Sequence, residues 1–224
     1  MKNRFLLQLF HFVLAACLTW FAAFAQGVEE SPNALIERIT KDALDTIQTD
    51  TAVQAGDVAR IIDLLDHKIM PYLNFQRMTS SAVGPAWRKA TPDQRKRLEA
   101  EFKTLLVRTY AGAMSQAKNL TFSIKPLRAS PEDKEVIVRT VIRGRGDPVQ
   151  LDYRLEKTPG EGAGWKIYNL NVLGVWLVDT YRSQFSQEIN TKGIDGLILT
   201  LTDRNKSNAA GAAKSVKPVK PAKD

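Results

Sequence analysis

The stretch WKIYNLNVLGVWLVDTYRSQF, residues 165–185, decides how sheet and helix are joined in this chain. Its first eight residues alternate as a β-strand does, with Trp165 and Ile167 facing away from the apolar positions that follow them. Its last residues repeat at helical spacing through Tyr181 and Phe185. Between them lies VLGVWLV, residues 172–178, which has no charged or polar side chain. We therefore predict a strand that turns at Gly174 into a helix and carries more apolar surface than the join itself needs.

Three more alternating runs precede this strand. They are Phe122 to Ile124, VIVRTVIR at 136–143 and VQLDYRLE at 149–156, and the turn-forming sequences ASPED, GRGDP and PGEGAG separate the runs. In the third run, the apolar set that includes Tyr153 is predicted to be buried, whereas the alternate set that begins with Asp152 is predicted to face solvent. Four short runs joined by turns indicate an antiparallel meander.

Helices are predicted on both sides of the meander. Ser31-Pro32 starts one, a second follows from about Asp57 to Met70, and Thr91-Pro92-Asp93-Gln94 forms a capping box that opens a long helix to about Ala117. Two more are expected at 175–189 and 194–201, with Gly193 as the break. The order of helices, strands and helices predicts an α+β fold, in which four to five strands could curl into a cone-like half barrel.

The chain ends predict a secreted domain with two flanking segments. Basic residues precede an apolar run from Phe12 to Phe24, and Ala23-Phe24-Ala25 fits signal-peptidase cleavage, so we expect residues 1–25 to be an export signal cut after about Ala25. An uncleaved anchor and a lipidated Cys17 are the alternatives. Residues 205–224 contain Ala, Lys and Pro without core-forming side chains, which predicts a disordered tail. The folded domain is then 26–204.

Composition excludes several classes of function. Residues 26–204 carry 25 basic and 23 acidic side chains, so the folded surface lacks the excess positive charge of a nucleic-acid-binding protein. After removal of the signal, no cysteine and one histidine, His67, remain. Thiolate chemistry, disulfides and multi-histidine metal sites are therefore excluded. The basic run Arg95-Lys96-Arg97 is either a solvated helix face or a contact for an acidic partner.

Several motifs in this order resemble the MlaC family, also called toluene-tolerance proteins. They are GPAWRKATPDQRKRLEAEFKTLLVRTYA (84–111), QLDYRLEK, GWKIYNLNVLGVWLVDTYRSQF and TKGIDGLILTL (191–201), and the similarity covers about residues 31–204. Two positions depart from the family pattern: Asn169 stands where aspartate is usual, and Trp176 stands where serine is usual. The tryptophan puts the volume of a ligand cavity in doubt.

The resemblance implies a periplasmic phospholipid carrier with an NTF2-like or cystatin-like cone of strands and helices. We expect no enzyme activity, because the alternation of the third run points Asp152 away from the face that carries Tyr153, where a carboxylate base and a tyrosine would need to meet. The resemblance implies no cofactor, and docking to two assemblies. These are an inner-membrane lipid ABC transporter with a ring of substrate-binding domains and an outer-membrane lipoprotein and porin complex.

A carrier of this kind needs an apolar cavity, because each methylene group moved from lipid into water costs about 0.8 kcal/mol. We expect flexible and aromatic side chains on facing elements to line it: Phe75, Met78, Leu106, Tyr110 and Met114 on helices, Val138, Ile142 and Tyr153 on the sheet, and Val175, Trp176 and Tyr181 after the last strand. Ordinary core packing is the alternative for each of these residues. The rival functions are a protein adaptor without a small ligand and an isomerase-type enzyme in the cone.

Overall fold

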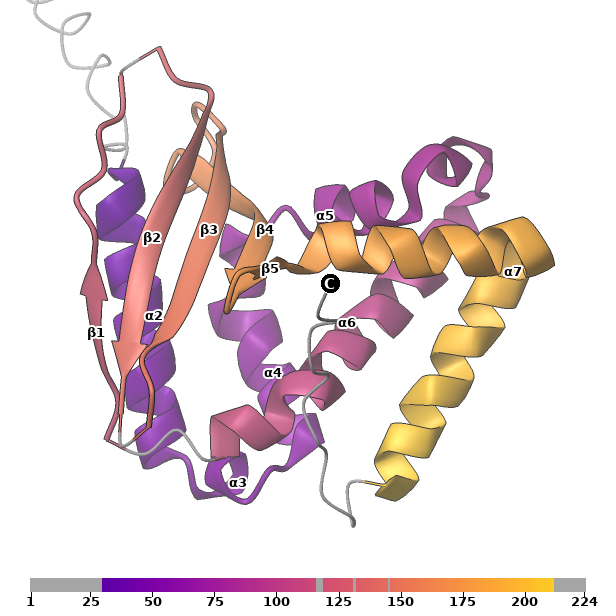
Figure 1. Ribbon diagram of the computed structural model, residues 1–224, viewed down its shortest axis with the longest axis horizontal. Helices are drawn as coiled ribbons and strands as arrows, with labels where there is room; N and C mark the ends of the chain where they lie inside the picture. The colour runs from indigo at the N-terminus through magenta and orange to yellow at the C-terminus, as the bar shows by residue number, and fades with distance from the viewer. Residues whose placement is uncertain (1–29, 116–118, 131, 145, 212–224) are drawn as a thin grey trace, which may run out of the picture.

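The computed structural model describes residues 30–115, 119–130, 132–144 and 146–211 (Figure 1). The expected signal peptide and the expected tail from residue 212 onward lie outside these ranges. Within the described residues, no helix combines the length and the hydropathy that crossing a bilayer requires.

Helices form at the positions that the capping signals predict. α2 spans Pro32–Thr49, and the Ser31 Oγ accepts a hydrogen bond from the Ala34 amide at 3.2 Å. α6 spans Pro92–Ser115 and opens with the predicted capping box: the Gln94 amide donates to Thr91 Oγ1, and the Thr91 amide donates to Gln94 Oε1. The remaining helical segments before the sheet are α3 (Thr51–Gln54), α4 (Val58–Lys68), η1 (Met70–Tyr72), α5 (Phe75–Val83) and η2 (Gly84–Lys89).

The strands form one antiparallel sheet in chain order, β1-β2-β3-β4-β5, which confirms the predicted meander and the α+β fold. Its strands are β1 (Thr121–Ile124), β2 (Glu135–Arg143), β3 (Val149–Lys157), β4 (Trp165–Val172) and β5 (Val175–Trp176). The register between β3 and β4 shifts at Arg154 and Leu155. This bulge corrects the simple alternation predicted for β4, because Ile167 pairs with Leu155 while Leu170 pairs with Tyr153, which puts both on one face.

The VLGVWLV segment contains a tight hairpin followed by a helix. Leu173 (φ 53°) and Gly174 (φ 88°) both have left-handed backbone conformations, as a two-residue primed turn requires. The Asn171 Oδ1 supports this turn by accepting a hydrogen bond from the Gly174 amide at 2.8 Å. The chain then forms the two residues of β5 before α7 begins. Gly174 therefore makes the predicted bend, but the bend joins two strands rather than a strand and a helix.

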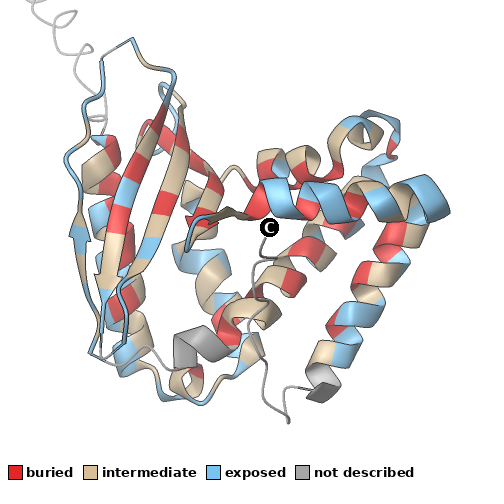
Figure 2. Ribbon diagram, viewed as in Figure 1, coloured by how far each residue is buried: buried red, intermediate tan, exposed pale blue. Residues whose placement is uncertain are grey.

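Two cores hold the domain together (Figure 2). In the sheet core, α2 packs across one face of the sheet, and Leu35, Ile36 and Ile39 meet buried strand residues such as Val138 and Leu155. The helical core joins α5, α6 and α7 through Leu98, Phe102, Phe185, Leu197 and Ile198, among others. A smaller apolar group that includes Ile61 and Val107 packs between α4 and α6.

α7 spans Leu177–Gly211 and is bent at Gly193, whose φ of 71° and ψ of −173° are not helical. This bend confirms the predicted break between two C-terminal helices. The second arm continues past Asn205, the expected start of the tail, and Asn205 itself is only 5% exposed. The boundary predicted at 205 was therefore wrong, because Asn205 donates to the Glu101 side chain and main chain and fixes this turn to α6.

Asp152 provides a second correction. The alternation of β3 placed it on the solvent face, yet it is only 6% exposed. Its Oδ2 accepts a hydrogen bond from Gln150 Nε2 at 2.8 Å, and its Oδ1 has no hydrogen-bond partner among the described residues. The period of two gave the correct side of the strand but not how deeply that side is covered.

Candidate functional site

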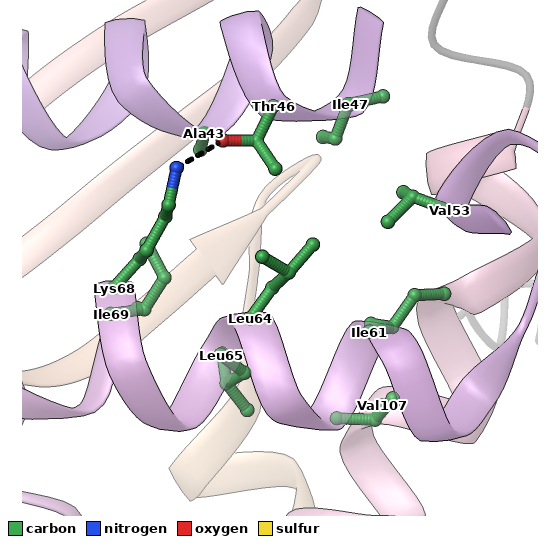
Figure 3. Close-up of a pocket in the computed structure, with 10 residues that line it drawn as sticks. All are labelled: Ala43, Thr46, Ile47, Val53, Ile61, Leu64, Leu65, Lys68, Ile69 and Val107. Atoms are coloured by element: carbon green, nitrogen blue, oxygen red, sulfur yellow. Dashed lines mark hydrogen bonds between the residues drawn. The ribbon is translucent and has the colours of Figure 1, made fainter. Parts of the chain in front are cut away.

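An apolar pocket of about 90 Å³ lies between α2, α3, α4 and α6 (Figure 3). Leu64 and Ile61 point from α4 toward α2, and Ile47 points back toward them. Val53 closes the end at α3, and Val107 contributes from α6. The other lining residues are Ala43, Thr46, Leu65, Lys68 and Ile69. The pocket is suited to hydrocarbon because nearly all of its lining groups are apolar.

Lys68 is the one charged group among the lining residues. It stands at the C-terminal end of α4, and its Nζ donates a hydrogen bond to Thr46 Oγ1 on α2 at 2.9 Å (Figure 3). Lys68 is exposed, and no carboxylate of the described chain lies within ion-pair distance of it. The rim of the pocket therefore carries a cation that forms no ion pair within the described residues.

Five of the eleven residues predicted to line a cavity lie in or against the helical core. Phe75, Met78 and Tyr181 are buried there, and Leu106 and Tyr110 pack against them. The Phe75 and Tyr181 rings belong to an aromatic cluster around Phe102, with ring centroids 5.9 and 5.0 Å from it. Met114 belongs to the last turn of α6, and its side chain lies outside the described residues.

Most of the predicted sheet residues lie on the face that α2 covers. Val138 is fully buried in the sheet core, and Tyr153 packs against it from the neighbouring strand. Ile142 is half-buried further along β2, on the same face by the alternation of the strand. The structure therefore gathers the predicted helical residues in or against the helical core and the predicted sheet residues on the face of the sheet core. None of the described members of either group lines the pocket of Figure 3.

The two predicted residues of β5 lie on opposite faces of the sheet. Val175 pairs with Val172, whereas Trp176 pairs with Asn171 and so shares the face of Asp152. The Arg154 guanidinium lies 3.9 Å from the centre of the Trp176 ring. Trp176 is therefore directed away from the face that carries Val138 and Tyr153. Contact of these eleven residues with a ligand stays a prediction.

The tyrosines predicted for the cavity are neutral at any physiological pH. Burial raises the pKa of Tyr110 to about 12, and burial also raises the pKa values of Tyr153 and Tyr181. Their hydroxyl groups bring polarity without charge, which suits an interior next to apolar surface.

The buried asparagines of β4 hold the backbone in place. The Asn169 side chain is 2% exposed, and its Oδ1 accepts hydrogen bonds from the amides of Leu170 at 2.9 Å and Val178 at 3.1 Å. It thereby satisfies an amide in the first turn of α7 from the adjacent strand, as a helix cap does. With Asn171 bound to the hairpin turn, both side chains support the backbone where β4 leads through β5 into α7.

Asp152 and Tyr153 do not form the carboxylate and tyrosine pair that an isomerase-type enzyme in the cone would use. Asp152 and Tyr153 are neighbours in β3, so their side chains point to opposite faces. In the described ranges, no three His, Cys, Asp or Glu side chains gather as they would around a metal ion.

Sequence reasoning missed the pocket of Figure 3 as a site, although it predicted the two helices that supply most of its lining. Ala43 and Ile47 recur at helical spacing in the first helix, and Ile61, Leu65 and Ile69 do so in the second. The signal was present, because these short helices carry apolar positions in excess of one contact face. The sequence does not show that these apolar faces of α2 and α4 lie opposite each other, beside Val107, and leave a pocket between them.

Known proteins resemble this chain over most of its length. The protein from Ralstonia solanacearum whose structure was solved as a phospholipid-binding protein in complex with a phospholipid has 40% identity and a TM-score of 0.75; the match covers 79% of this chain and 98% of that one. The toluene tolerance protein Ttg2D of Pseudomonas putida is 23% identical over 74% of this chain and 76% of its own. The intermembrane phospholipid transport system binding protein MlaC of Haemophilus influenzae is 24% identical over 84% of this chain and 86% of its own. The family model described as MlaC protein matches residues 37–203, well over half of the sequence, and this chain therefore belongs to the MlaC family.

Proposed function

We propose that this protein binds a phospholipid, shields its acyl chains in an apolar interior and carries it through the periplasm. The observation that carries this proposal is the likeness to the Ralstonia protein solved with a phospholipid, at 40% identity and across 98% of that chain. The likeness to a protein of a phospholipid transport system in Haemophilus supports transport as the purpose of binding.

The apolar pocket of Figure 3 is the proposed point of entry for an acyl chain. It lies beside Val107 on α6. Val107 follows Leu98 by nine residues, which at about 100° per residue is two and a half helical turns, so the pocket and the helical core lie on opposite faces of α6. Its 90 Å³ is far below the roughly 300 Å³ at which pockets for small ligands begin. A phospholipid must therefore enlarge the pocket, and we expect it to do so by moving α4 away from α2.

The rim of this pocket is suited to a phosphate group. Opening the space between α2 and α4 breaks the hydrogen bond between Lys68 and Thr46, which frees an ammonium group and a hydroxyl group at the same edge. A phosphate placed there gains a charge-assisted hydrogen bond while the tails lie among Leu64, Ile47 and Ile61.

The proposed route has two ends. The carrier receives and delivers lipid at the inner-membrane ABC transporter with its ring of substrate-binding domains and at the outer-membrane lipoprotein and porin complex. Residues 1–25 direct export, and cleavage after about Ala25 releases the carrier into the periplasm. The chain acts by binding and release, not as an enzyme.

Native mass spectrometry of protein purified from its own periplasm tests this proposal. We expect one phospholipid per wild-type chain, and organic extraction followed by lipid mass analysis identifies it. A wild-type chain that arrives empty and takes up no lipid from vesicles refutes the carrier, as an adaptor would behave in that way. Release of a chemically converted product would instead indicate an enzyme.

Two variants test where the tails bind. Leu64→Trp fills the pocket of Figure 3, and Val175→Glu places a charge among the residues predicted after the last strand. Leu199→Trp is the matched control because Leu199 is 58% exposed and does not line the pocket. We expect Leu64→Trp to lose lipid with native circular dichroism while the control keeps it. Full lipid occupancy in Leu64→Trp would reject this pocket, and full occupancy in Val175→Glu would reject the predicted β5 contact.

A further inference from the structure

α5 leads into α6 at the end of the molecule far from the sheet (Figure 1), and this part of the chain carries a group of basic residues. We call it the basic patch and define it as Arg88, Lys89, Arg95, Lys96, Arg97 and Arg182. Arg95 links its parts, because its guanidinium donates to the carbonyl groups of Trp87 and Arg88 and lies 5.4 Å from the centre of the Trp87 ring. Arg182 joins from α7, where its guanidinium lies beside Gly84.

Within the described chain, these cations are not neutralised by ion pairs. The ion pairs of the described residues involve Arg38, Arg60, His67, Arg77, Lys103, Arg154, Lys166 and Lys192, and no member of the basic patch. Asp93 is the one acidic residue between positions 88 and 97. Five of the 25 basic residues of the segment 26–204 thus lie within ten positions, and the remainder of that segment is slightly acidic.

The patch does not serve the stability of α6. The N-terminus of a helix carries a partial positive charge, which disfavours cations by about 0.3–1 kcal/mol each within the first turn. Arg95, Lys96 and Arg97 lie directly after that first turn, and Arg88 and Lys89 precede it. Arg88 and Lys89 lie in the last turn of η2, and Arg95 is held by the Trp87 and Arg88 carbonyl groups. Lys96, Arg97 and Arg182 are exposed and form no ion pair within the described residues, so the patch keeps charge that a partner can meet.

We propose that the basic patch is a docking surface for a protein partner that presents a cluster of carboxylate groups. Arginine guanidinium groups bind carboxylates with two parallel hydrogen bonds, and arginine and tryptophan are the residues most enriched at the energetic centres of protein interfaces. The patch combines four arginines with Trp87, which is half-buried against the helical core and held in place by Arg95.

The chemistry of the patch favours a protein over a membrane. Proteins that bind bilayers combine basic residues with apolar side chains that insert among the acyl chains. The large apolar side chains that are exposed in the described chain, Leu173 and Leu199, belong to the β4–β5 hairpin and the second arm of α7, and Trp87 is not among them. The patch is thus built for charge recognition rather than insertion.

This docking proposal rests on the proposed function, which supplies the two candidate partners, and a pair of charge-reversal variants tests it. The patch variant carries Arg88→Glu, Lys89→Glu and Lys96→Glu, all at exposed positions. The control carries Lys41→Glu, Lys125→Glu and Arg128→Glu, which change the net charge equally at exposed positions near α2 and β1. Binding to the purified transporter complex and to the purified lipoprotein and porin complex is measured over a range of NaCl concentrations.

We expect the patch variant to bind at least one complex about tenfold more weakly than wild type, because each reversal turns an attraction into a repulsion. The control should stay within about twofold of wild type. The affinity of the wild type, but not of the patch variant, should fall steeply as added salt shortens the screening length from about 30 Å toward about 8 Å. Equal binding of the two variants to both complexes, or no binding of the wild type to either, overturns the proposal.

Two further measurements separate this surface from the other possibilities. If the patch variant loses only its binding to vesicles of phosphatidylglycerol and phosphatidylethanolamine, the patch is a membrane contact and the docking proposal is wrong. Native mass spectrometry of bound phospholipid tests the proposed function separately. We expect equal lipid occupancy in wild type, patch variant and control. An empty wild-type chain would refute the carrier, whereas the binding measurements alone decide the docking surface.

Discussion

Asn169→Ala is expected to lower the free energy of unfolding by about 2–3 kcal/mol. The Asn169 Oδ1 accepts hydrogen bonds from the amides of Leu170 and Val178, and the side chain is 2% exposed, so water cannot easily replace it. Loss of a helix cap costs about 0.5–2 kcal/mol, and a buried amide left without a partner costs about 1–3 kcal/mol. Both costs include the lost hydrogen bond to the Val178 amide, so they are not added in full, and the expected total is about 2–3 kcal/mol.

Urea unfolding monitored by far-ultraviolet circular dichroism measures this change, and thermal unfolding should show a melting temperature about 5–10 °C below wild type, at about 2–4 °C for each kcal/mol in a chain of this size. Asn169→Asp is the matched control. Its carboxylate keeps the acceptor and lies near the positive end of α7, so we expect it to stay within about 1 kcal/mol of wild type. If the alanine variant unfolds within about 0.5 kcal/mol of wild type, the capping role assigned to Asn169 is wrong.

Three further predictions concern backbone geometry and charge. Leu173→Asn should raise the free energy of unfolding by about 1 kcal/mol in urea, because Leu173 is 63% exposed and has a φ of 53° that Asn tolerates better; a decrease would contradict this. Gly193→Ala should cost about 1–3 kcal/mol in the same assay, since φ 71° with ψ −173° is a region open almost only to glycine, and an unchanged midpoint would show that the bend relaxes freely. Hydrogen bonds from Arg77 and Tyr168 hold the pKa of Glu135 below its ordinary 4.5, so its stabilising effect is present above pH 4.5 and is lost as the pH falls through the lower folded-state pKa. Glu135→Gln should therefore flatten the acid side of the curve of stability against pH, and an identical acid side in both proteins would count against it.

Local signals predicted the elements of this fold, because their physics involves only neighbouring residues. The Ser31 cap, the capping box of Thr91 and Gln94, and the break at Gly193 each lie where expected. Depth of burial depends on distant segments and was predicted less well. Asp152 is covered although its strand position indicated solvent, and Asn205 is fixed to Glu101 although its surroundings in sequence resemble a tail.

The candidate site was harder to predict for the same reason. A helical stripe such as that of Leu98 and Phe102 is apolar whether it packs solidly or leaves space for a ligand. The space between α2 and α4 is lined by Ile47 from one helix and Leu64 from the other, and whether two such faces leave space depends on how both helices pack, not on either sequence alone. The face of the sheet on which Trp176 lies likewise depends on the register of β5, and a strand of two residues is too short to show a periodicity.

The chain-order sheet and the late position of α7 together set the sequence in which the domain can assemble. Each strand pairs with the one before it, so the sheet can grow by adding hairpins as the chain becomes available. The helical core cannot close in this way, because Phe102 finds its edge-on ring partners Tyr181 and Phe185 only in α7. Until the last fifth of the polypeptide arrives, the aromatic side of α6 stays uncovered, and a chain shortened before Tyr181 would keep its strands while exposing a surface prone to aggregation.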